Sequence, residues 1–137
     1  MADGQMLAAL SALQTFAIYF GTALGLVVLY LVAYPAATSR NQFSLVRQNV
    51  LSASLALGFS LVGFALPLSS ALVYSREVLD TVIWGVVAIL VQILVYWLVR
   101  LLVPRLPHRI AAGEMSAALF LGAASLAAGI LNAAAMR

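Results

Sequence analysis

The chain offers few side chains that could carry out a reaction. It has one histidine, four acidic residues and no cysteine among its 137 residues. A serine-hydrolase arrangement would need His108 to meet both an activated serine and a carboxylate. Of the acidic residues, only Glu114 is expected on the same side of the fold as His108. Metal catalysis needs three converging ligands, and phosphate chemistry needs a glycine-rich loop, and the sequence has neither pattern. We therefore expect a non-enzymatic protein with no cofactor and no bound metal.

A second group of polar residues falls at the midpoints of four long apolar stretches. This candidate polar belt consists of Thr22, Ser60, Gln92 and Ser125. Such a belt could line a narrow hydrophilic path or a ligand site. The structural alternative is that Ser and Thr bond to their own helix backbone while Gln92 bonds to a neighbouring helix. We favour the structural alternative, because an unpaired primary amide in hydrocarbon is costly.

The elements that must position these residues are long stretches without charge. Of all residues, 65% are hydrophobic and 8% are charged, which excludes a water-soluble monomer. The uncharged stretches cover residues 4–39, 48–75, 81–99 and 115–136. Each can cross a bilayer core of roughly 30 Å once as a helix, and none is long enough to cross it twice. We predict an all-α protein with four transmembrane helices at about 11–34, 49–73, 80–103 and 114–135.

Arginine placement predicts the orientation of these helices. Two polar connections, 35–48 and 104–113, hold or adjoin five arginines, which are Arg40, Arg47, Arg100, Arg105 and Arg109. By the positive-inside rule, both connections face the cytoplasm and both chain ends lie outside. Glu114 belongs to the same inner interface, where a carboxylate suits the start of a helix and can pair with Arg105 or Arg109. No basic residue precedes Arg40, so we expect the first span to be retained rather than removed as a secretory signal.

Small residues recur along one face of the second and the fourth predicted helices. This candidate packing stripe consists of Ala53, Ala56, Gly63, Ala118, Gly122 and Gly129. In a bilayer, helices gain little from burying apolar surface, so close backbone approach supplies the contact. We predict that these two helices form the inner pair of the bundle or an oligomer interface, with the other two outside. Gly21 and Gly25 add a GxxxG pattern in the first helix.

The two halves of the chain resemble each other. Ser60-Leu-Val-Gly63 matches Ser125-Leu-Ala-Ala-Gly129 with one residue of slip. Each half holds two spans, so the halves share one orientation and are expected to relate by an axis along the membrane normal. The predicted fold is thus two parallel-related helical hairpins within a single membrane domain, 1–137. The two repeats are predicted to cover residues 11–73 and 80–135.

Three stretches carry a resemblance to a known family. They are Asn49-Val-Leu-Ser-Ala-Ser-Leu-Ala-Leu-Gly58, the following Ser60-Leu-Val-Gly63, and the closing Gly129-Ile-Leu-Asn-Ala-Ala-Ala-Met136. Over nearly its whole length the chain resembles the YjfL-like family of bacterial inner-membrane proteins, a domain of unknown function (DUF350). The resemblance implies a bacterial plasma-membrane protein and supplies no reaction, substrate or catalytic residue. Relatives are often encoded beside membrane-stress proteins of the phage-shock type, which implies a membrane-stress protein as a partner.

Two functions are compatible with the sequence. The first is a non-catalytic membrane component that self-associates or docks a partner through its small-residue faces and basic inner loops. The alternative is a small oligomeric channel or transporter whose path passes the polar belt. We favour the first, because no charged residue falls inside a span, whereas ion-coupled transport normally uses buried charges. The expected partners are the lipid bilayer and further copies of the chain. Nucleic acid is not expected, because seven scattered arginines make no continuous basic stripe.

Overall fold

The computed structural model describes residues 2–39 and 41–136, and within them it contains helices and short connections only. The helices are α1 (Ala2–Ala37), α2 (Gln42–Arg47), α3 (Leu51–Tyr74), α4 (Val78–Leu102), α5 (Leu106–Ala111) and α6 (Met115–Ala135). Four of them, α1, α3, α4 and α6, are long and apolar enough to cross a membrane. The prediction of an all-α protein with four membrane-spanning helices is therefore confirmed.

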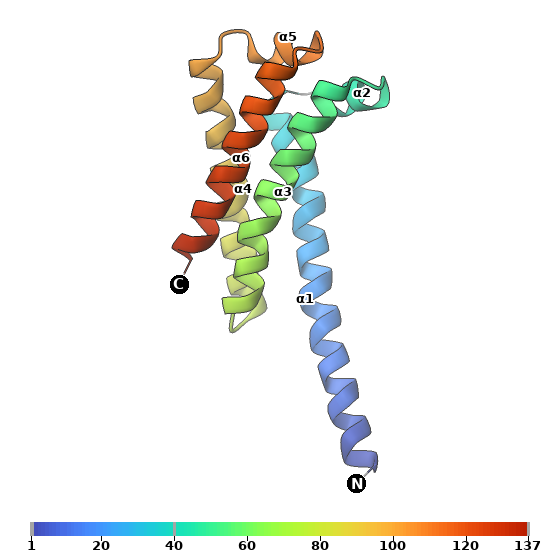
Figure 1. Cartoon of the computed structure of the whole chain (residues 1–137). Helices are drawn as coiled ribbons and strands as arrows, with labels where there is room; N and C mark the ends of the chain where they lie inside the picture. The colour runs from blue at the N-terminus through green and yellow to red at the C-terminus, as the bar shows by residue number, and fades with distance from the viewer. Residues whose placement is uncertain (1, 40, 137) are drawn as a thin grey trace.

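The first helix is longer than predicted at both ends. It begins at Ala2 rather than near residue 11, because residues 6–10 are apolar and residues 2–10 contain no helix-breaking proline. It also continues past Pro35 to Ala37, beyond the predicted end near residue 34. The Tyr34 carbonyl accepts bonds from the Thr38 backbone N–H (3.0 Å) and the Thr38 hydroxyl (2.6 Å), and these bonds hold the turn that follows the proline. The N-terminal half of α1 consequently extends well beyond the end of the other helices (Figure 1).

The centre of the bundle is the pair α3 and α6. Both helices start at the end of the molecule that carries α2 and α5, so they run in the same direction (Figure 1). These two helices make the most extensive contact in the chain, α4 packs against both of them, and α1 packs mainly on α4. The fully buried side chains include Phe64 on α3, Ala88 on α4 and Ala118 on α6. The core is thus a layer of side chains between α3, α4 and α6, closed by the C-terminal half of α1.

The two predicted connections each contain a short helix that packs on the bundle. Helix α2 lies within 35–48 and α5 within 104–113. The same backbone pattern follows both helices: Asn49 (φ 66°) precedes α3 and Gly113 (φ 88°) precedes α6. The Val50 N–H donates to the Leu45 carbonyl, five residues back, and the Glu114 N–H donates to the Arg109 carbonyl in the same way. These hydrogen bonds are typical of a helix C-terminus that ends with one residue in the left-handed backbone conformation, a position that favours Gly or Asn. Both connections therefore end in the same type of backbone turn before the next long helix begins.

Candidate functional site

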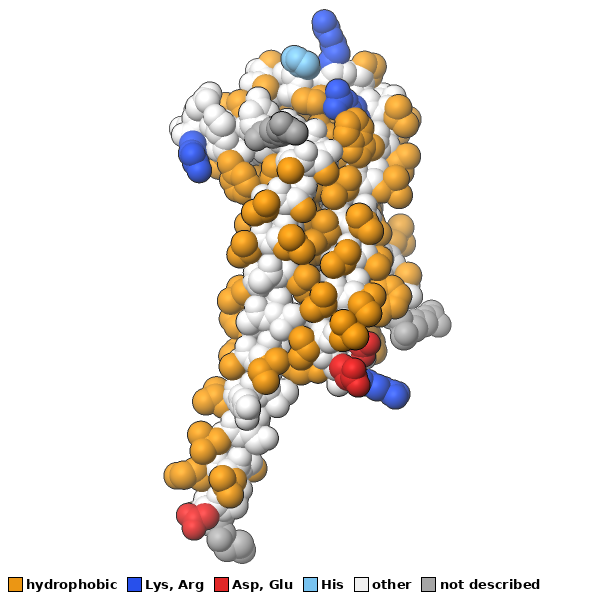
Figure 2. Space-filling model, turned by 180° about the vertical axis from the view of Figure 1, so that it is seen from behind, with side chains coloured by type: hydrophobic (Ala, Val, Ile, Leu, Met, Phe, Trp, Pro, Cys, Tyr) orange, Lys and Arg blue, Asp and Glu red, His pale blue; other side chains and the backbone are white. Residues whose placement is uncertain are grey.

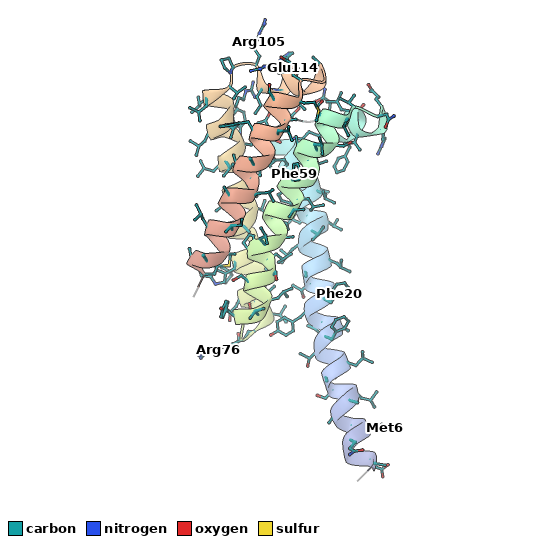
Figure 3. The ribbon with its side chains drawn as sticks, in the orientation of Figure 1. Met6, Phe20, Phe59, Arg76, Arg105 and Glu114 are labelled. Atoms are coloured by element: carbon teal, nitrogen blue, oxygen red, sulfur yellow. The ribbon has the colours of Figure 1, made fainter. Side chains whose placement is uncertain are left out.

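The backbones of α3 and α6 touch at two glycines. A Cβ atom built on Gly129 would collide with the carbonyl group of Gly63, and one built on Gly63 would collide with the carbonyl group of Ser125. At Gly122, on the same face of α6, a Cβ would lie 2.6 Å from the ring of Phe59, which Figure 3 shows on α3. Close approach of this kind supplies dispersion contacts and Cα–H···O contacts that larger residues would prevent.

The whole candidate packing stripe is buried inside this chain. Ala53, Ala56 and Ala118 are 3%, 6% and 0% exposed, respectively, and all three glycines of the stripe are also buried. The stripe therefore forms the inner helix pair of the monomer. Because its residues are covered by the chain itself, they are not open to a second molecule in this structure.

Gln92 extends from α4 onto the contact between α3 and α6. Its Nε2 donates to the Ser125 carbonyl at 3.1 Å, and the side chain is fully buried. The same nitrogen would lie 3.0 Å from a Cβ atom on Gly63. The Gln92 side chain therefore bonds α4 to α6 and lies next to Gly63 of α3. It contacts three of the four long helices.

The hydroxyls of the polar belt differ in their surroundings. Ser60 donates to the Leu57 carbonyl on its own helix at 2.8 Å, and Thr22 donates to the Ile18 carbonyl at 2.7 Å. Thr22 lies on a partly exposed part of α1. The Ser125 hydroxyl is buried and has no hydrogen-bond partner among the described residues. The structure thus brings Gln92 and Ser125 into contact, while Thr22 and Ser60 each bond to their own helix.

Sequence reasoning missed a cluster of buried aromatic rings beside these polar residues. Tyr30 stacks on Phe64 with ring centroids 4.4 Å apart and on Tyr34 at 5.0 Å, and Tyr34 meets Tyr96 edge-on at 6.1 Å. All four side chains are 2% exposed or less. Tyr30 and Tyr34 are four residues apart, so they lie on one face of the helix with Ala23 and Leu26, which are also buried. This spacing could have predicted that the two tyrosines face the core. This aromatic cluster joins α1 to α3 and α4.

The hydroxyls of this aromatic cluster have no standard hydrogen bonds within the described residues. The Tyr30, Tyr34 and Tyr96 hydroxyl oxygens are all buried and have no hydrogen-bond partner in the part of the chain that the structure describes. The Gln92 Oε1 atom is also buried without a partner in that part of the chain. Buried polar atoms are normally hydrogen-bonded, so each of these unpartnered atoms is an exception to the general pattern.

The charged residues separate between the two ends of the molecule. Arginines gather at the end formed by α2 and α5, whereas Glu77 and Asp80 lie with Arg76 at the opposite end of the bundle, and Asp3 lies in the first turn of α1 (Figure 2). Arg47 and Arg105 are exposed, and the Arg100 guanidinium lies 5.0 Å from the centre of the Trp97 ring. The remaining predicted arginine at this end, Arg40, lies outside the described residues.

Glu114 precedes α6 and forms an ion pair with Arg109, whose Nε lies 3.2 Å from Glu114 Oε2. Figure 3 shows Glu114 and Arg105 at the same end of the bundle. Glu114 makes no side-chain capping bond to α6, although it occupies the capping position. Within residues 2–39 and 41–136, no three His, Cys, Asp or Glu side chains converge on a point that could hold a metal ion.

Comparison with known proteins agrees with this architecture. The model of the family described as Domain of Unknown Function (DUF350) matches residues 6–136. The chain is 38% identical over 127 residues to the UPF0719 inner membrane protein YjfL of Escherichia coli strain K12, an alignment that covers 93% of this chain and 96% of the relative. The same figures hold for the protein of that name from Escherichia coli O157:H7. No solved structure matches the chain. Its four apolar helices and these matches show that the chain belongs to the DUF350 family of inner-membrane proteins.

Proposed function

We propose that this protein is a non-catalytic component of the bacterial inner membrane that self-associates through α1. The observation that carries the proposal is how little of α1 the chain itself covers. In its most apolar window, 17% of the α1 residues are buried, against 44% in α3 and 33% in both α4 and α6. Few side chains hold such a helix against the rest of the chain. A helix from a second protein would add specific packing contacts that mobile lipid tails do not provide.

The glycines of α1 support the same interface. A Cβ atom built on Gly21 or Gly25 would meet nothing within 4 Å. With Ala17, these residues present small side chains every fourth position, a pattern that lets two helices approach closely in a bilayer. The stripe on α3 and α6 is already buried within the monomer, whereas α1 offers an exposed small-residue face to another copy.

The length of α1 gives a second reason for a protein partner. Its 36 residues span about 54 Å at the helical rise, whereas the hydrocarbon core is about 30 Å thick. Exposed apolar side chains recur along α1 from Met6 to Phe20 (Figure 3). In a dimer, the N-terminal part of α1 from a second copy would pack against the same part of the first copy. This contact would cover the apolar side chains that extend beyond the hydrocarbon core.

The test is the oligomeric state of the protein after polymer extraction into native lipid discs, measured by native mass spectrometry. We expect an oligomer for the unmodified chain and a monomer for the Gly21→Ile/Gly25→Ile double variant. The matched control is Gly58→Ile on α3, where a Cβ also meets nothing within 4 Å. It should keep the oligomer. A monomeric unmodified chain, or a double variant with an unchanged oligomer, would contradict the proposal.

A small oligomeric channel or transporter is the second candidate. The buried Gln92 Oε1 and Ser125 hydroxyl, which lack partners among the described residues, favour it, because a polar path would give these atoms hydrogen bonds. Purified protein in liposomes distinguishes the candidates. Ion or solute flux that Gln92→Leu abolishes would support a channel, whereas an impermeable bilayer containing the oligomer would support the non-catalytic component.

We also propose that the end carrying α2 and α5 faces the cytoplasm. The exposed Arg47 and Arg105 support this orientation through the positive-inside rule and through attraction to anionic lipid headgroups. A membrane-stress protein, the partner that the family resemblance implies, would dock at this end. Co-purification of such a protein that is lost in an Arg47→Ala/Arg105→Ala variant would support the assignment, and unchanged co-purification would contradict it.

A further inference from the structure

A cavity of about 450 Å³ lies at the end of the bundle opposite α2 and α5. It is bounded by the turn between α3 and α4, by the first two turns of α4, and by Met136, which follows α6. Its wall includes the aromatic residues Tyr74 and Trp84 together with the oppositely charged Arg76 and Asp80. The volume falls within the range of about 300–1,000 Å³ that is typical of small-molecule sites.

Hydrogen bonds hold the α3–α4 turn in a defined shape. The Ser75 hydroxyl donates to the backbone carbonyl four residues back and accepts a hydrogen bond from the Thr81 hydroxyl at 2.9 Å. Asp80 Oδ2 accepts from the backbone N–H groups of Arg76 (3.3 Å) and Glu77 (3.4 Å). Because these bonds fix the backbone of the turn, the wall is organised before a ligand binds, which lowers the cost of binding.

Arg76 and Asp80 line the same cavity with opposite charges. Within the described ranges, 2–39 and 41–136, charged side chains come within ion-pair distance only at Arg109 and Glu114, at the other end of the bundle. Arg76 and Asp80 are thus not paired with each other, and Figure 3 shows Arg76 extending outward from the turn. A ligand with both a positive and a negative group could contact both residues, whereas one of them would repel a singly charged ligand.

The position of the cavity along the bundle corresponds to the depth of lipid headgroups. Two of the four apolar spans end here, since α3 ends at Tyr74 and α4 begins at Val78. Trp and Tyr are enriched at this boundary of a bilayer. Tyr74 is 67% exposed and Trp84 is 42% exposed, so both rings can contact a lipid. The exposed Val73 and Ile83 nearby would contact its acyl chains.

We infer that this cavity binds the headgroup of an ethanolamine phospholipid. The phosphate of such a lipid contacts Arg76, because a guanidinium group can donate two parallel hydrogen bonds to phosphate oxygens. The ammonium group contacts the Asp80 carboxylate and the face of the Trp84 or Tyr74 ring, which attracts cations. The two charges of the ligand thus match the two charges of the cavity wall.

The same chemistry disfavours two other common headgroups. The ammonium group of ethanolamine donates hydrogen bonds to a carboxylate, whereas the trimethylammonium group of choline has no N–H to donate. A glycerol headgroup carries only the phosphate charge, which Asp80 repels. The inference depends on neither self-association nor orientation, because every wall residue comes from one chain and both surfaces of a bilayer carry headgroups.

Native mass spectrometry of the full chain tests the lipid preference. The protein is released from nanodiscs that contain equal amounts of phosphatidylethanolamine, phosphatidylcholine and phosphatidylglycerol with the same acyl chains, and each retained lipid is identified by its mass. We expect several-fold more retained phosphatidylethanolamine than either other lipid. Soluble phosphoethanolamine at the same concentration should not displace it, because it lacks acyl chains. Equal retention of the three lipids would overturn the inference, and displacement would show that the ligand is a soluble zwitterion instead of a lipid.

A matched pair of charge-neutralising variants locates the site. Asp80→Asn removes the charge but keeps a side-chain oxygen that can accept the hydrogen bonds of the turn. Glu77→Gln makes the same change at an exposed residue that does not line the cavity. Asp80→Asn should abolish the preference for phosphatidylethanolamine, whereas Glu77→Gln should leave it unchanged. If the preference survives in Asp80→Asn, or is lost equally in both variants, the assignment to this cavity fails.

A pair of tryptophan variants tests the same site without changing the turn. Trp84 and Trp97 are both 42% exposed, and Trp97 lies outside the cavity, beside Arg100. Trp84→Leu should lower the retention of phosphatidylethanolamine several-fold, whereas Trp97→Leu should not change it. Equal retention by the two variants would contradict binding at this cavity.

Discussion

At Gly63 and Gly129, the absence of a side chain determines how closely two helices pack. The two atoms closest to a Cβ built at either position belong to backbone, which cannot rotate away as the end of a flexible side chain can. Gly58 lies on the same helix as Gly63, but a Cβ there meets nothing within 4 Å. Identical substitutions at the two sites therefore separate the effect of packing from the effect of helix propensity.

We expect Gly63→Ala to lower the free energy of unfolding by about 1–3 kcal/mol, because the added methyl forces α3 and α6 apart. Gly58→Ala should be neutral or stabilising by up to about 1 kcal/mol, since alanine favours a helix more than glycine does. Reversible unfolding in mixed micelles, followed by circular dichroism, measures both. Equal effects of the two substitutions would show that the α3–α6 contact is not as close as described.

Among the described residues, Gln92 Nε2 donates one hydrogen bond and the buried Gln92 Oε1 has no partner, so these two atoms have opposite effects on stability. We expect Gln92→Leu to change the free energy of unfolding by less than about 1 kcal/mol, because interhelical hydrogen bonds in membranes average about 0.6 kcal/mol and the unpaired oxygen is removed as well. Gln14→Leu on exposed α1 is the control. A loss of several kcal/mol in the same unfolding assay would mean that Gln92 belongs to a larger hydrogen-bonded network.

The two halves of α1 differ in what they contact. Its C-terminal half carries Leu26, Tyr30 and Tyr34 into the core, whereas its N-terminal half has no buried side chain. Leu26 packs directly against Gly85 of α4, where a Cβ would lie 2.7 Å from its Cδ1. This contact explains how α1 is attached to α4 with so few buried residues.

A matched pair of leucines tests this attachment. Leu26 is 5% exposed and Leu24 is 50% exposed. Leu26→Ala should destabilise the bundle by about 1–3 kcal/mol, less than in a soluble core, because leucine released into lipid keeps an apolar environment and the loss of packing alone remains. Leu24→Ala should be close to neutral. Equal unfolding midpoints for the two variants would contradict the described packing of α1 on α4.

Across the whole molecule, the ends of the bundle are chemically distinct. The α2–α5 end holds Arg47, Arg100, Arg105 and the Arg109–Glu114 pair, while Glu77 and Asp80 accompany Arg76 at the other end. Both described chain ends lie on the side of the α3–α4 turn, away from α2 and α5 (Figure 1). An even number of spans requires this shared side, and the charge difference is the basis of the orientation proposed above.

We expect a C-terminal alkaline phosphatase fusion to be active and a C-terminal green fluorescent protein fusion to be dark, because the positive-inside rule places the chain ends outside the cytoplasm. Fusions inserted after Arg47, in the turn between α2 and α3, should give the reverse result. Fluorescence from the C-terminal fusion in intact cells would invert the orientation proposed for the whole protein.

The sequence alone determined the four spans, the all-α fold and the burial environment of the apolar stretches. Hydropathy is read from consecutive residues. Because the bilayer core has a fixed thickness, the length of an apolar stretch is enough to locate a membrane-spanning helix. The small-residue face of α3 and α6 was also visible, because its period is helical. The length of α1 was underestimated at its C-terminal end because a proline suggests a helix end without requiring one. At its N-terminal end, the polar residues that precede Met6 suggested a later start.

Only the tertiary structure decided which helix face meets which partner. That Gly63 meets Gly129 within one chain, that Tyr30, Tyr34 and Tyr96 cluster around Phe64, and that Gln92 contacts Ser125 depend on pairings between residues distant in the sequence. In hydrocarbon every face of such a helix is apolar, so the contrast between inside and outside that guides prediction in soluble proteins is absent. Packing shape and a few hydrogen bonds select the arrangement instead, and these become visible only when the helices are together.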